Sequence, residues 1–400
     1  MNENEKRKII MKTKKIAVVS GSRADYGIIF TLLQLLQNDR DFKLQLIVTG
    51  MHLLKKFGKT IDQIKKDGFQ IAAIVRIDIT GAQGIDIGRA IGKATIKFTE
   101  TLDNLKPDLI ILQGDRFEML AAATAALALN IPIAHIHGGE ITEGLIDEQI
   151  RHSITKMGHL HFCSTELYRK RIIQMGEQPK YVFNVGAPGL DLIKQIRLLS
   201  KEDLEKSLDF KFDDKTVLLT YHPVSLSKEQ TIKETEALFK FMQQTNFDWI
   251  ITYPNADNFN DIVLKKIMEF SQTYKNGKIQ IIKSLGSQRY FSVLKYVRFV
   301  IGNSSSGIIE AAMFKKPVID IGIRQKGRLK PANIISIENV TITNLKKALQ
   351  KISSIEFTNK LLKLKNPYGS GDSSKKIINT LKKIDSYDYL LTKKFWDIKV

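Results

Sequence analysis

The chain has 400 residues, 43% of them hydrophobic, which suits two domains with buried cores. Its formal net charge is +20, but lysines alternate with apolar residues in stretches such as "NTLKKIDSYDYLL", as on solvated faces of amphipathic helices, so we expect no nucleic-acid partner. The single cysteine, Cys163, excludes an internal disulfide framework, and the absence of a long apolar run argues against a membrane partner.

The chain begins with a charged tail, residues 1–14, which lacks the apolar core of a secretory signal. Together with the lone cysteine, this segment predicts a cytoplasmic protein. Residues 15–195 then alternate apolar, β-branched runs with segments of helical period. The strand-like runs are "KIAVVS", "LQLIVTG", "DLIILQG", "IPIAHIH", "HLHFC" and "YVFNVG". This alternation predicts an α/β domain with a doubly wound, Rossmann-like parallel sheet.

A charged connection near residues 190–210 marks a domain boundary, and a second α/β series fills residues 210–372. Its strand-like runs are "TVLLTYHP", "DWIITYP", "IQIIKSL", "RFVIGN" and "KPVIDIG". We therefore predict two Rossmann-like domains that face each other across a cleft, with ligands at the carboxyl ends of their strands.

Polar residues follow these apolar runs directly, in "SGSRADYG", "QGDRFE", "HIHGGE", "YHP" and "GNSSSG". Turns need glycine and small polar residues, but they do not need Arg23, Asp115, Arg116, Glu140 or His222. Neither GxGxxG after the first strand nor GxxxxGK[ST] occurs, which argues against the common dinucleotide and P-loop modes of binding.

The stretch "VIGNSSSGIIE" predicts a seat for an anion at a helix N-terminus, where free backbone N–H groups favour negative charge. Ser304 and Ser305 add hydroxyl donors, and Glu310, about one turn later, suits the hydroxyl groups of a ribose. Phosphate and sugar together indicate a nucleotide, and Arg324 beyond the next strand adds a guanidinium for phosphate. The alternative is a serine-rich helix cap with a surface glutamate.

Two His-x-His pairs, in "HIHGGE" and "HLHFC", raise the question of zinc. Each pair lies in a strand-like run whose alternation points both histidines to one face. We interpret them as core or supporting residues and expect no metal.

These motifs resemble the hydrolysing UDP-N-acetylglucosamine 2-epimerases of sialic and legionaminic acid biosynthesis. The resemblance rests on "GSRADYG", "GDRFE", "HIHGGE", "DEQIRH", "YHPV" and "GNSSSGIIEA", from about residue 15 to residue 375. It implies the GT-B-like fold of many nucleotide-sugar glycosyltransferases. It also implies a C-terminal helix, within residues 373–400, that crosses back to the first domain.

The resemblance also implies roles for individual residues. Four match catalytic positions: Asp115, Glu140, Asp147 and His222. Seven match substrate and nucleotide positions: Arg23, Arg116, Asn255, Ser304, Ser305, Glu310 and Arg324.

The implied reaction converts UDP-N-acetylglucosamine, or a UDP- or GDP-linked diacetamido sugar, to the free 2-epimer and a nucleoside diphosphate. Elimination would give a glycal, and rehydration would return a proton to C2 from the opposite face. Opposite faces require two proton-handling groups, for which Asp115 and Glu140 are the first candidates, and repulsion among clustered carboxylates favours one of them as an acid. No cofactor is required, and a homo-oligomer, dimer or tetramer, is expected.

Three alternatives remain on sequence grounds: a non-hydrolysing UDP-N-acetylglucosamine 2-epimerase, a GT-B glycosyltransferase and a non-catalytic nucleotide-sugar sensor.

Overall fold

The computed structural model describes residues 13–54, 59–77, 84–142, 146–223, 227–254 and 259–398. Asn255, which the motif comparison assigns to the nucleotide, lies outside the described residues. Among the helices in the described ranges, none combines the length and apolarity needed to cross a membrane.

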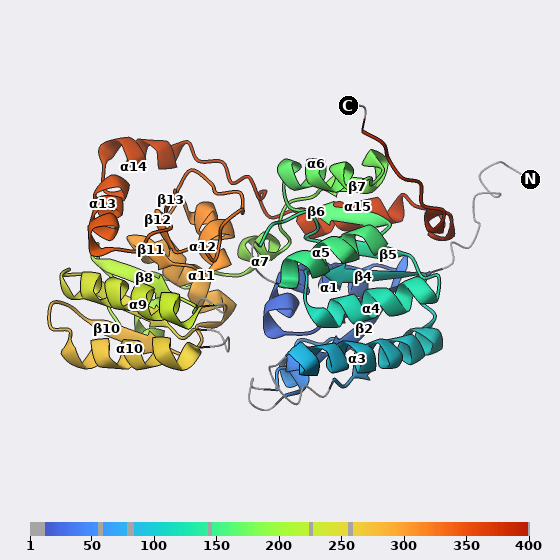
Figure 1. Cartoon of the computed structure of the whole chain (residues 1–400), viewed down its shortest axis with the longest axis horizontal. Coiled ribbons are helices and arrows are strands. Elements are labelled where there is room, and N and C mark those ends of the chain that lie inside the picture. Colours follow the sequence, from blue (N-terminus) through green and yellow to red (C-terminus); the bar gives the residue numbers. More distant parts are fainter. Residues whose placement is uncertain are drawn as a thin grey trace, which may run out of the picture. The chain divides into compact units, whose positions relative to one another are not determined.

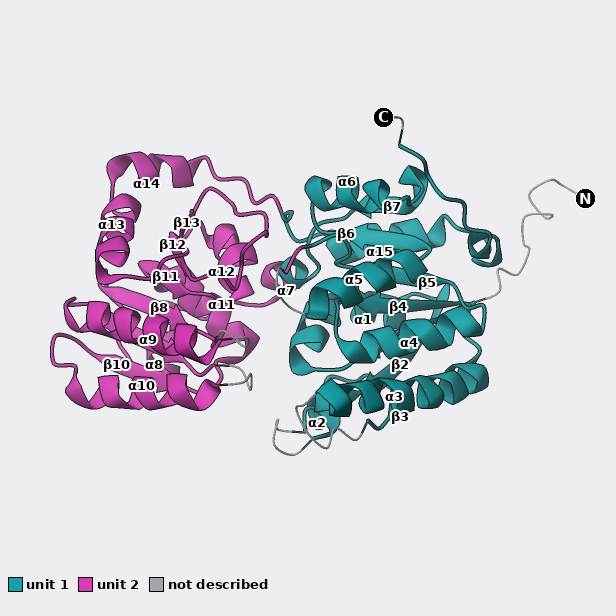
Figure 2. Ribbon diagram, in the orientation of Figure 1, with its two compact units in different colours: residues 1–140, 145–192, 368–400 teal, residues 141–144, 193–367 magenta. Residues whose placement is uncertain are grey.

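The chain divides into two compact units (Figure 2). Unit 1 comprises residues 1–140, 145–192 and 368–400, and unit 2 comprises residues 141–144 and 193–367. The chain therefore leaves unit 1 near residue 192 and returns to it near residue 368.

Unit 1, which Figure 1 draws in blue to green with its C-terminal helix α15 in red, is built on a seven-stranded sheet. The strand order is β3-β2-β1-β4-β5-β6-β7, with parallel neighbours throughout. Its strands are β1 (Lys14–Ser20), β2 (Phe42–Thr49), β3 (Ile71–Val75), β4 (Leu109–Gln113), β5 (Ile133–Ile136), β6 (Leu160–Cys163) and β7 (Val182–Asn184). Its helices are α1 (Arg23–Asn38), α2 (Ile61–Lys66), α3 (Gly84–Leu105), α4 (Phe117–Ala128), α5 (Ile146–Met157), α6 (Glu166–Gln174) and α15 (Ser373–Lys382), with the 3-10 turns η1 (Gly50–Leu53), η3 (Pro179–Tyr181) and η5 (Asp388–Leu391). Helix α7 (Gly189–Gln195) spans the crossing to unit 2.

Unit 2 contains a six-stranded parallel sheet in the order β10-β9-β8-β11-β12-β13. Its strands are β8 (Thr216–Thr220), β9 (Asp248–Thr252), β10 (Ile279–Ile282), β11 (Phe299–Gly302), β12 (Val318–Ile321) and β13 (Ile334–Ile337). Its helices are α8 (Lys201–Leu208), α9 (Lys228–Gln243), α10 (Asn260–Thr273), α11 (Gly286–Tyr296), α12 (Ser305–Ile309), α13 (Ile342–Ile352) and α14 (Ile355–Leu362), with the 3-10 turn η4 (Ala311–Phe314). The two sheets confirm the predicted α/β class with two Rossmann-like domains.

The central strands are apolar throughout because both faces of each sheet are covered. In β1, Ile16 and Val18 pack in the core cluster that contains α1 and α15. Ala17 and Val19, which point to the opposite face, pack in the cluster that contains α3 and α4. Polar side chains are unfavourable in a strand that is buried on both faces. The polar candidate residues therefore lie in the loops that follow β1 and β4.

Each sheet reverses its strand order once, between β1 and β4 in unit 1 and between β8 and β11 in unit 2. At such a switch point the loops that follow the two strands diverge, and open α/β sheets bind ligands there. We therefore expect a ligand site among the residues that follow these four strands.

The C-terminal helix α15 packs against α1, and three of its apolar side chains, Ile377, Ile378 and Leu381, join the α1 core cluster. Asp191 of α7 binds the start of α15: its carboxylate oxygens accept hydrogen bonds from the backbone N–H groups of Ser373 (2.9 Å) and Ser374 (2.6 Å). The last thirty-odd residues are thus an integral part of unit 1.

Candidate functional site

The first group of candidate residues follows β4 and β5 of unit 1, where Arg151 of α5 connects them. Arg151 is 1% exposed and pairs with the carboxylate of Asp115, which follows β4. Its Nη1 also donates to the backbone carbonyl of Glu140 (3.0 Å) and to Glu148 Oε2 (3.3 Å). A buried guanidinium needs such partners, and here they join the carboxylate of Asp115 and the backbone of Glu140 in one network.

Glu140 is held by two further side chains. Its Oε1 lies 2.8 Å from Ser164 Oγ, which donates to it, and 2.7 Å from His137 Nδ1. Ser164 directly follows β6 and His137 directly follows β5, so two neighbouring strands contribute to this carboxylate's surroundings. Only 4% of the Glu140 side chain is exposed.

The two glycines between His137 and Glu140 are required by close packing. A Cβ at Gly139, whose φ is +75°, would lie 2.7 Å from the carbonyl oxygen of Tyr168 and 2.9 Å from Ile172 Cγ1. Arg171 of the same helix, α6, donates to the Gly139 carbonyl. Helix α6 thus supports the turn that carries Glu140.

The second group in unit 1 lies around Arg116. Its guanidinium donates to both carboxylate oxygens of Glu118, at 3.2 and 2.9 Å. Burial lowers the pKa of Arg116, but the neighbouring carboxylates, Glu118 above all and then Asp25 and Asp147, outweigh burial and raise that pKa. Asp147, in the first turn of α5, therefore lies within electrostatic reach of Arg116.

Asp25 is a buried carboxyl that the motif comparison did not single out. Burial raises its pKa to about 6, against the opposing effects of Arg116 and the Ser22 hydroxyl. Its Oδ2 is buried without a hydrogen-bond partner among the described residues. Arg23, two residues earlier, is exposed at the start of α1.

The 3-10 turn η1 packs closely against Glu118 and Gly21 at this end of the sheet. Gly50 has φ +59°, and a Cβ there would lie 2.7 Å from Glu118 Oε1 and 2.8 Å from the Gly21 carbonyl. His52 is fully buried between Ser20 Oγ (2.9 Å from Nε2) and Thr60 Oγ1 (2.7 Å from Nδ1). Burial lowers the pKa of His52 to about 4, so it is neutral at physiological pH.

In unit 2, Asn303 joins the ends of β8 and β11 at the switch point. Its side chain exchanges two hydrogen bonds with the backbone of His222, accepting from the N–H and donating to the carbonyl, each at 2.7 Å. The Asn303 carbonyl accepts from Arg324 Nη1 (3.2 Å) and Gln325 Nε2 (2.9 Å). His222 is buried, and its pKa is lowered to about 3 by burial and by Arg324, so it too is neutral at physiological pH.

Gly302, immediately before Asn303, has φ +141°, and a Cβ there would overlap the Thr220 carbonyl oxygen. Only glycine allows the two strands to come this close. The close approach of Gly302 to Thr220 and the hydrogen bonds of Asn303 together bring His222, Arg324 and the serine stretch to the same end of the sheet.

The serine stretch forms a shorter helix than the sequence suggested. Ser304 is the N-cap, with its hydroxyl accepting from Ser306 N (3.4 Å), and α12 ends after five residues, before η4. Ser306 Oγ is hydrogen-bonded to Tyr290 of α11. Glu310, at the end of α12, has its pKa raised by burial, and its Oε2 is buried without a partner among the described residues. Ser304, Ser305 and Glu310 therefore lie on one short helix beside the β11 end.

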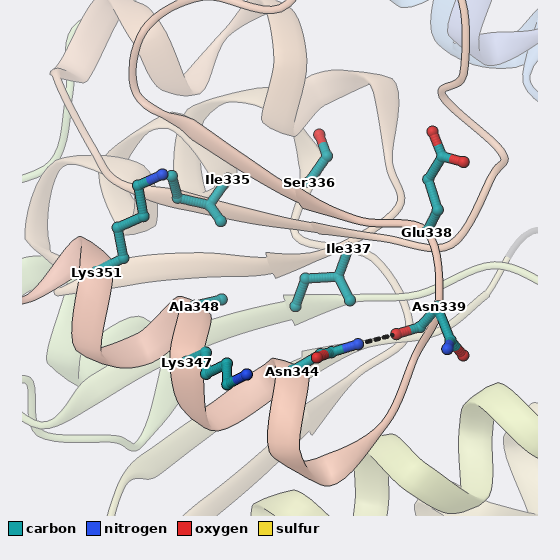
Figure 3. Close-up of a pocket in the computed structure, with 9 residues that line it drawn as sticks. All are labelled: Ile335, Ser336, Ile337, Glu338, Asn339, Asn344, Lys347, Ala348 and Lys351. Atoms are coloured by element: carbon teal, nitrogen blue, oxygen red, sulfur yellow. Dashed lines mark hydrogen bonds between the residues drawn. The ribbon is translucent and has the colours of Figure 1, made fainter.

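A shallow groove elsewhere in unit 2 does not coincide with these residues. It has a volume of about 300 Å³ and runs between β13 and α13, and Asn344 donates to the Asn339 carbonyl there at 2.9 Å (Figure 3). The sheet places β13 two strands away from β11. None of the predicted site residues lines this groove.

The histidine pairs are engaged in hydrogen bonds. His135 binds Thr155 Oγ1 through Nδ1 (3.1 Å) and the Gly114 carbonyl through Nε2 (2.8 Å). His161 Nε2 lies 3.1 Å from Glu177 Oε2, and His159 Nδ1 accepts from Ile133 N (3.1 Å). Within the described ranges, no group of three or more His, Cys, Asp and Glu residues has the arrangement of a metal site.

The sequence and the structure both have well-matched relatives. The family model for UDP-N-acetylglucosamine 2-epimerase matches residues 34–382. A GDP/UDP-N,N'-diacetylbacillosamine 2-epimerase (hydrolyzing) of Campylobacter jejuni is 42% identical over 389 residues, covering 97% of this chain and 100% of the relative. A UDP-N,N'-diacetylbacillosamine 2-epimerase (hydrolyzing) of Legionella pneumophila is 37% identical, with 95% and 98% covered. The crystal structure of a Neisseria meningitidis UDP-GlcNAc 2-epimerase bound to UDP-GlcNAc superposes with a TM-score of 0.80, at 20% identity, over 92% of this chain and 100% of that one.

Proposed function

The chain belongs to the UDP-N-acetylglucosamine 2-epimerase family, and from this premise we propose that it acts on a UDP- or GDP-linked N,N'-diacetylbacillosamine, with UDP-N-acetylglucosamine as the second candidate. It is a hydrolysing nucleotide-sugar 2-epimerase, with the GT-B-like fold that the resemblance implied. The observation that carries the substrate proposal is the 42% identity, along the full length, to a hydrolysing diacetylbacillosamine 2-epimerase.

The reaction divides into elimination and rehydration. Loss of the nucleoside diphosphate from C1 builds positive charge at that carbon, and removal of the C2 proton gives a C1–C2 double bond. Water then adds to C1 while C2 is protonated from the other face. The protein must therefore supply negative charge near C1, a base near C2 and positive charge for the leaving diphosphate.

Unit 1 supplies the acidic side chains. The carboxylate of Asp115 pairs with buried Arg151, and a carboxylate at this position is suited to stabilising positive charge at C1. Glu140, in the same network, and Asp147, beside Arg116, complete the proposed catalytic carboxylates.

Unit 2 supplies the nucleotide-binding groups. Ser304 and Ser305 offer hydroxyl and backbone donors at the start of α12, and Arg324 offers positive charge beside Asn303. Half-buried Glu310 is suited to accepting from ribose hydroxyls, and neutral His222 to hydrogen bonding with the sugar or diphosphate. Arg23, Arg116 and Asn255 are proposed as further contacts.

The test is a panel of donors: UDP- and GDP-N,N'-diacetylbacillosamine and UDP-N-acetylglucosamine, each followed by NMR and by release of nucleoside diphosphate. We expect the free 2-epimer with solvent deuterium at C2 when the reaction runs in D₂O. Product that keeps its nucleotide would indicate a non-hydrolysing epimerase. Glycosyl transfer to an acceptor without exchange at C2 would indicate a glycosyltransferase.

Asp115→Asn provides the matched comparison. We expect it to bind nucleoside diphosphate as the wild type does while turnover falls by about two to four orders of magnitude. Binding by both proteins with turnover by neither would indicate a nucleotide-sugar sensor.

Two further proposals concern the protein as a whole. We propose a homo-oligomer, testable by light scattering after size-exclusion chromatography. We also propose a cytoplasmic location, testable by cell fractionation.

A further inference from the structure

His137, which directly follows β5, has an unusual backbone. Its φ is +66°, in the left-handed region that glycine adopts freely and other residues enter at a cost. Two glycines come next, so a glycine at this position would have suited the turn. A strained backbone that carries a polar side chain points to a function for that side chain.

Glu140 fixes the orientation of the His137 ring. His137 Nδ1 lies 2.7 Å from Glu140 Oε1, the same oxygen that accepts from Ser164. A carboxylate is an acceptor, so Nδ1 carries the proton and donates it to this hydrogen bond. In the neutral ring Nε2 then holds the lone pair.

His137 Nε2 is buried and has no hydrogen-bond partner within the described part of the chain. A buried nitrogen without a partner costs free energy, and native proteins seldom keep one. His135, two residues earlier, uses both of its ring nitrogens within the protein. The contrast indicates that His137 Nε2 is kept for a group that the protein does not itself supply.

The position of His137 brings it next to the proposed catalytic carboxylates. The N–H of Gly114 donates to the Ile136 carbonyl at 3.1 Å, so Asp115 and His137 leave adjacent strands at the same level. Arg151 then connects Asp115 to the backbone of Glu140. The unpartnered nitrogen thus belongs to the same strand-end cluster as Asp115.

We propose that His137 is the base that removes the C2 proton, and that Glu140 acts through it as a positioning carboxylate in place of the catalytic role that the resemblance implies; this rests on the proposed function. The Nε2 lone pair takes the proton from C2, and the C–H electron pair becomes the C1–C2 double bond. The C1–O electron pair leaves with the nucleoside diphosphate. The positive charge on the imidazolium is stabilised by Glu140 at Nδ1, as a carboxylate stabilises a catalytic histidine elsewhere.

His137→Asn is the sharpest variant. Asparagine tolerates the left-handed backbone, and its side-chain amide reaches the place of Nδ1, so the contact to Glu140 survives while Nε2 is lost. We expect kcat to fall by about 10²- to 10⁴-fold on the donor that the wild type consumes fastest, with KM changed by less than about threefold and the Tm retained. The kinetic isotope effect with C2-deuterated donor should increase.

His137→Ala provides the second measurement. Added imidazole should restore part of its turnover, because it replaces the missing base, and it should not restore Asp115→Asn. Retention of wild-type kcat in His137→Asn, or failure of imidazole to restore a folded His137→Ala, would overturn the assignment. Loss of the folded state in both variants would also contradict it, since it would show a structural role for the ring.

The experiments distinguish the proposed function from the assignment of the base to His137. A wild-type enzyme inactive on every donor would overturn the proposed function and this assignment with it. An active wild type with an equally active His137→Asn would overturn only the assignment to His137.

Discussion

Asp25 illustrates how burial alone changes one side chain's behaviour. Its folded pKa is about 6 and its ordinary value is 3.8, chiefly because burial disfavours the charged form. Between these pH values the unfolded chain loses a proton that the folded protein keeps, so stability falls as pH rises from about 4 to about 6. The full penalty, about 3 kcal/mol from the size of the shift, applies above pH 6.

We therefore expect Asp25→Asn to gain stability relative to the wild type as pH rises through this window. Urea unfolding of both proteins at pH 4 and pH 7 measures it. A difference between the two proteins that is the same at both pH values would contradict the shifted pKa.

A second prediction concerns Asn303, because its side chain bridges the ends of β8 and β11. Asn303→Ala removes the hydrogen bonds that the N–H and carbonyl of His222 make with the Asn303 side chain, which costs about 1–3 kcal/mol for each bond. We expect a lower Tm and at least a tenfold loss of UDP affinity by calorimetry. Asn344→Ala, which removes a half-buried asparagine of the β13–α13 groove, is the control and should bind UDP as the wild type does.

The sequence placed Asp115, Glu140 and Ser304 at strand ends because each of them closely follows an apolar run, and the end of such a run marks the end of a buried strand. It did not single out Arg151, Asp25 or Ser164, although two of them lie in recognised motifs, and it interpreted His137 only as a core or supporting residue. Their roles depend on partners distant in sequence, such as the 36 positions between Arg151 and Asp115. The spacing of residues within a motif does not predict such long-range contacts.

At the scale of elements, α15 depends on a residue far from it in sequence. Asp191 caps the helix through Ser373 and Ser374, while Asp372, at the N-cap position, makes no side-chain cap hydrogen bond. Asp191→Ala leaves two buried N–H groups unpaired, and we expect a loss of about 2 kcal/mol in the free energy of unfolding. Asp372→Ala should change it by less than about 0.5 kcal/mol, and equal effects of the two variants in urea unfolding would contradict this.

Glu177 connects β6, α5 and the C-terminal segment. It is 2% exposed and lies against His161, Lys156 (2.6 Å) and Lys393 (2.7 Å). Burial raises the pKa of Glu177, but these partners outweigh burial and lower it to about 2 from 4.5. The associated stability is present above pH 4.5 and lost as pH falls towards 2.

Glu177→Gln should accordingly destabilise the protein by about 3 kcal/mol at pH 7 and by much less at pH 2.5. Chemical unfolding at the two pH values measures this. An undiminished difference at pH 2.5 would show that the lost stability came from packing and not from the charge.

The elements that the sequence did not reveal are the edge strands β3 and β13. Their side chains are half exposed, in contrast to the fully buried β4 and β8. The α12 helix is likewise shorter than "SGIIEAAMF" predicts, since the chain changes to a 3-10 turn after Glu310. Central strands and long amphipathic helices could be predicted because burial on two faces, or on one stripe, leaves a clear pattern.

At the scale of the whole molecule, each unit has its own core. The cluster that contains β8, β9 and α9 draws its residues from Val217 to Leu361, all within unit 2. We therefore expect a polypeptide of residues 193–367 to fold alone and to bind UDP, with a cooperative thermal transition by circular dichroism and binding by calorimetry. A disordered polypeptide would contradict the independence of this core, and a folded one without affinity for UDP would contradict the proposed nucleotide site.

The return of the chain to unit 1 has a consequence for biosynthesis. On the ribosome, α1 and its sheet emerge early, but the helix that covers them, α15, is translated only after the whole of unit 2. The nascent amino-terminal half must wait with an uncovered apolar surface while the following half is made. Chaperone binding during translation should concentrate in that interval and end once residue 382 has cleared the exit tunnel.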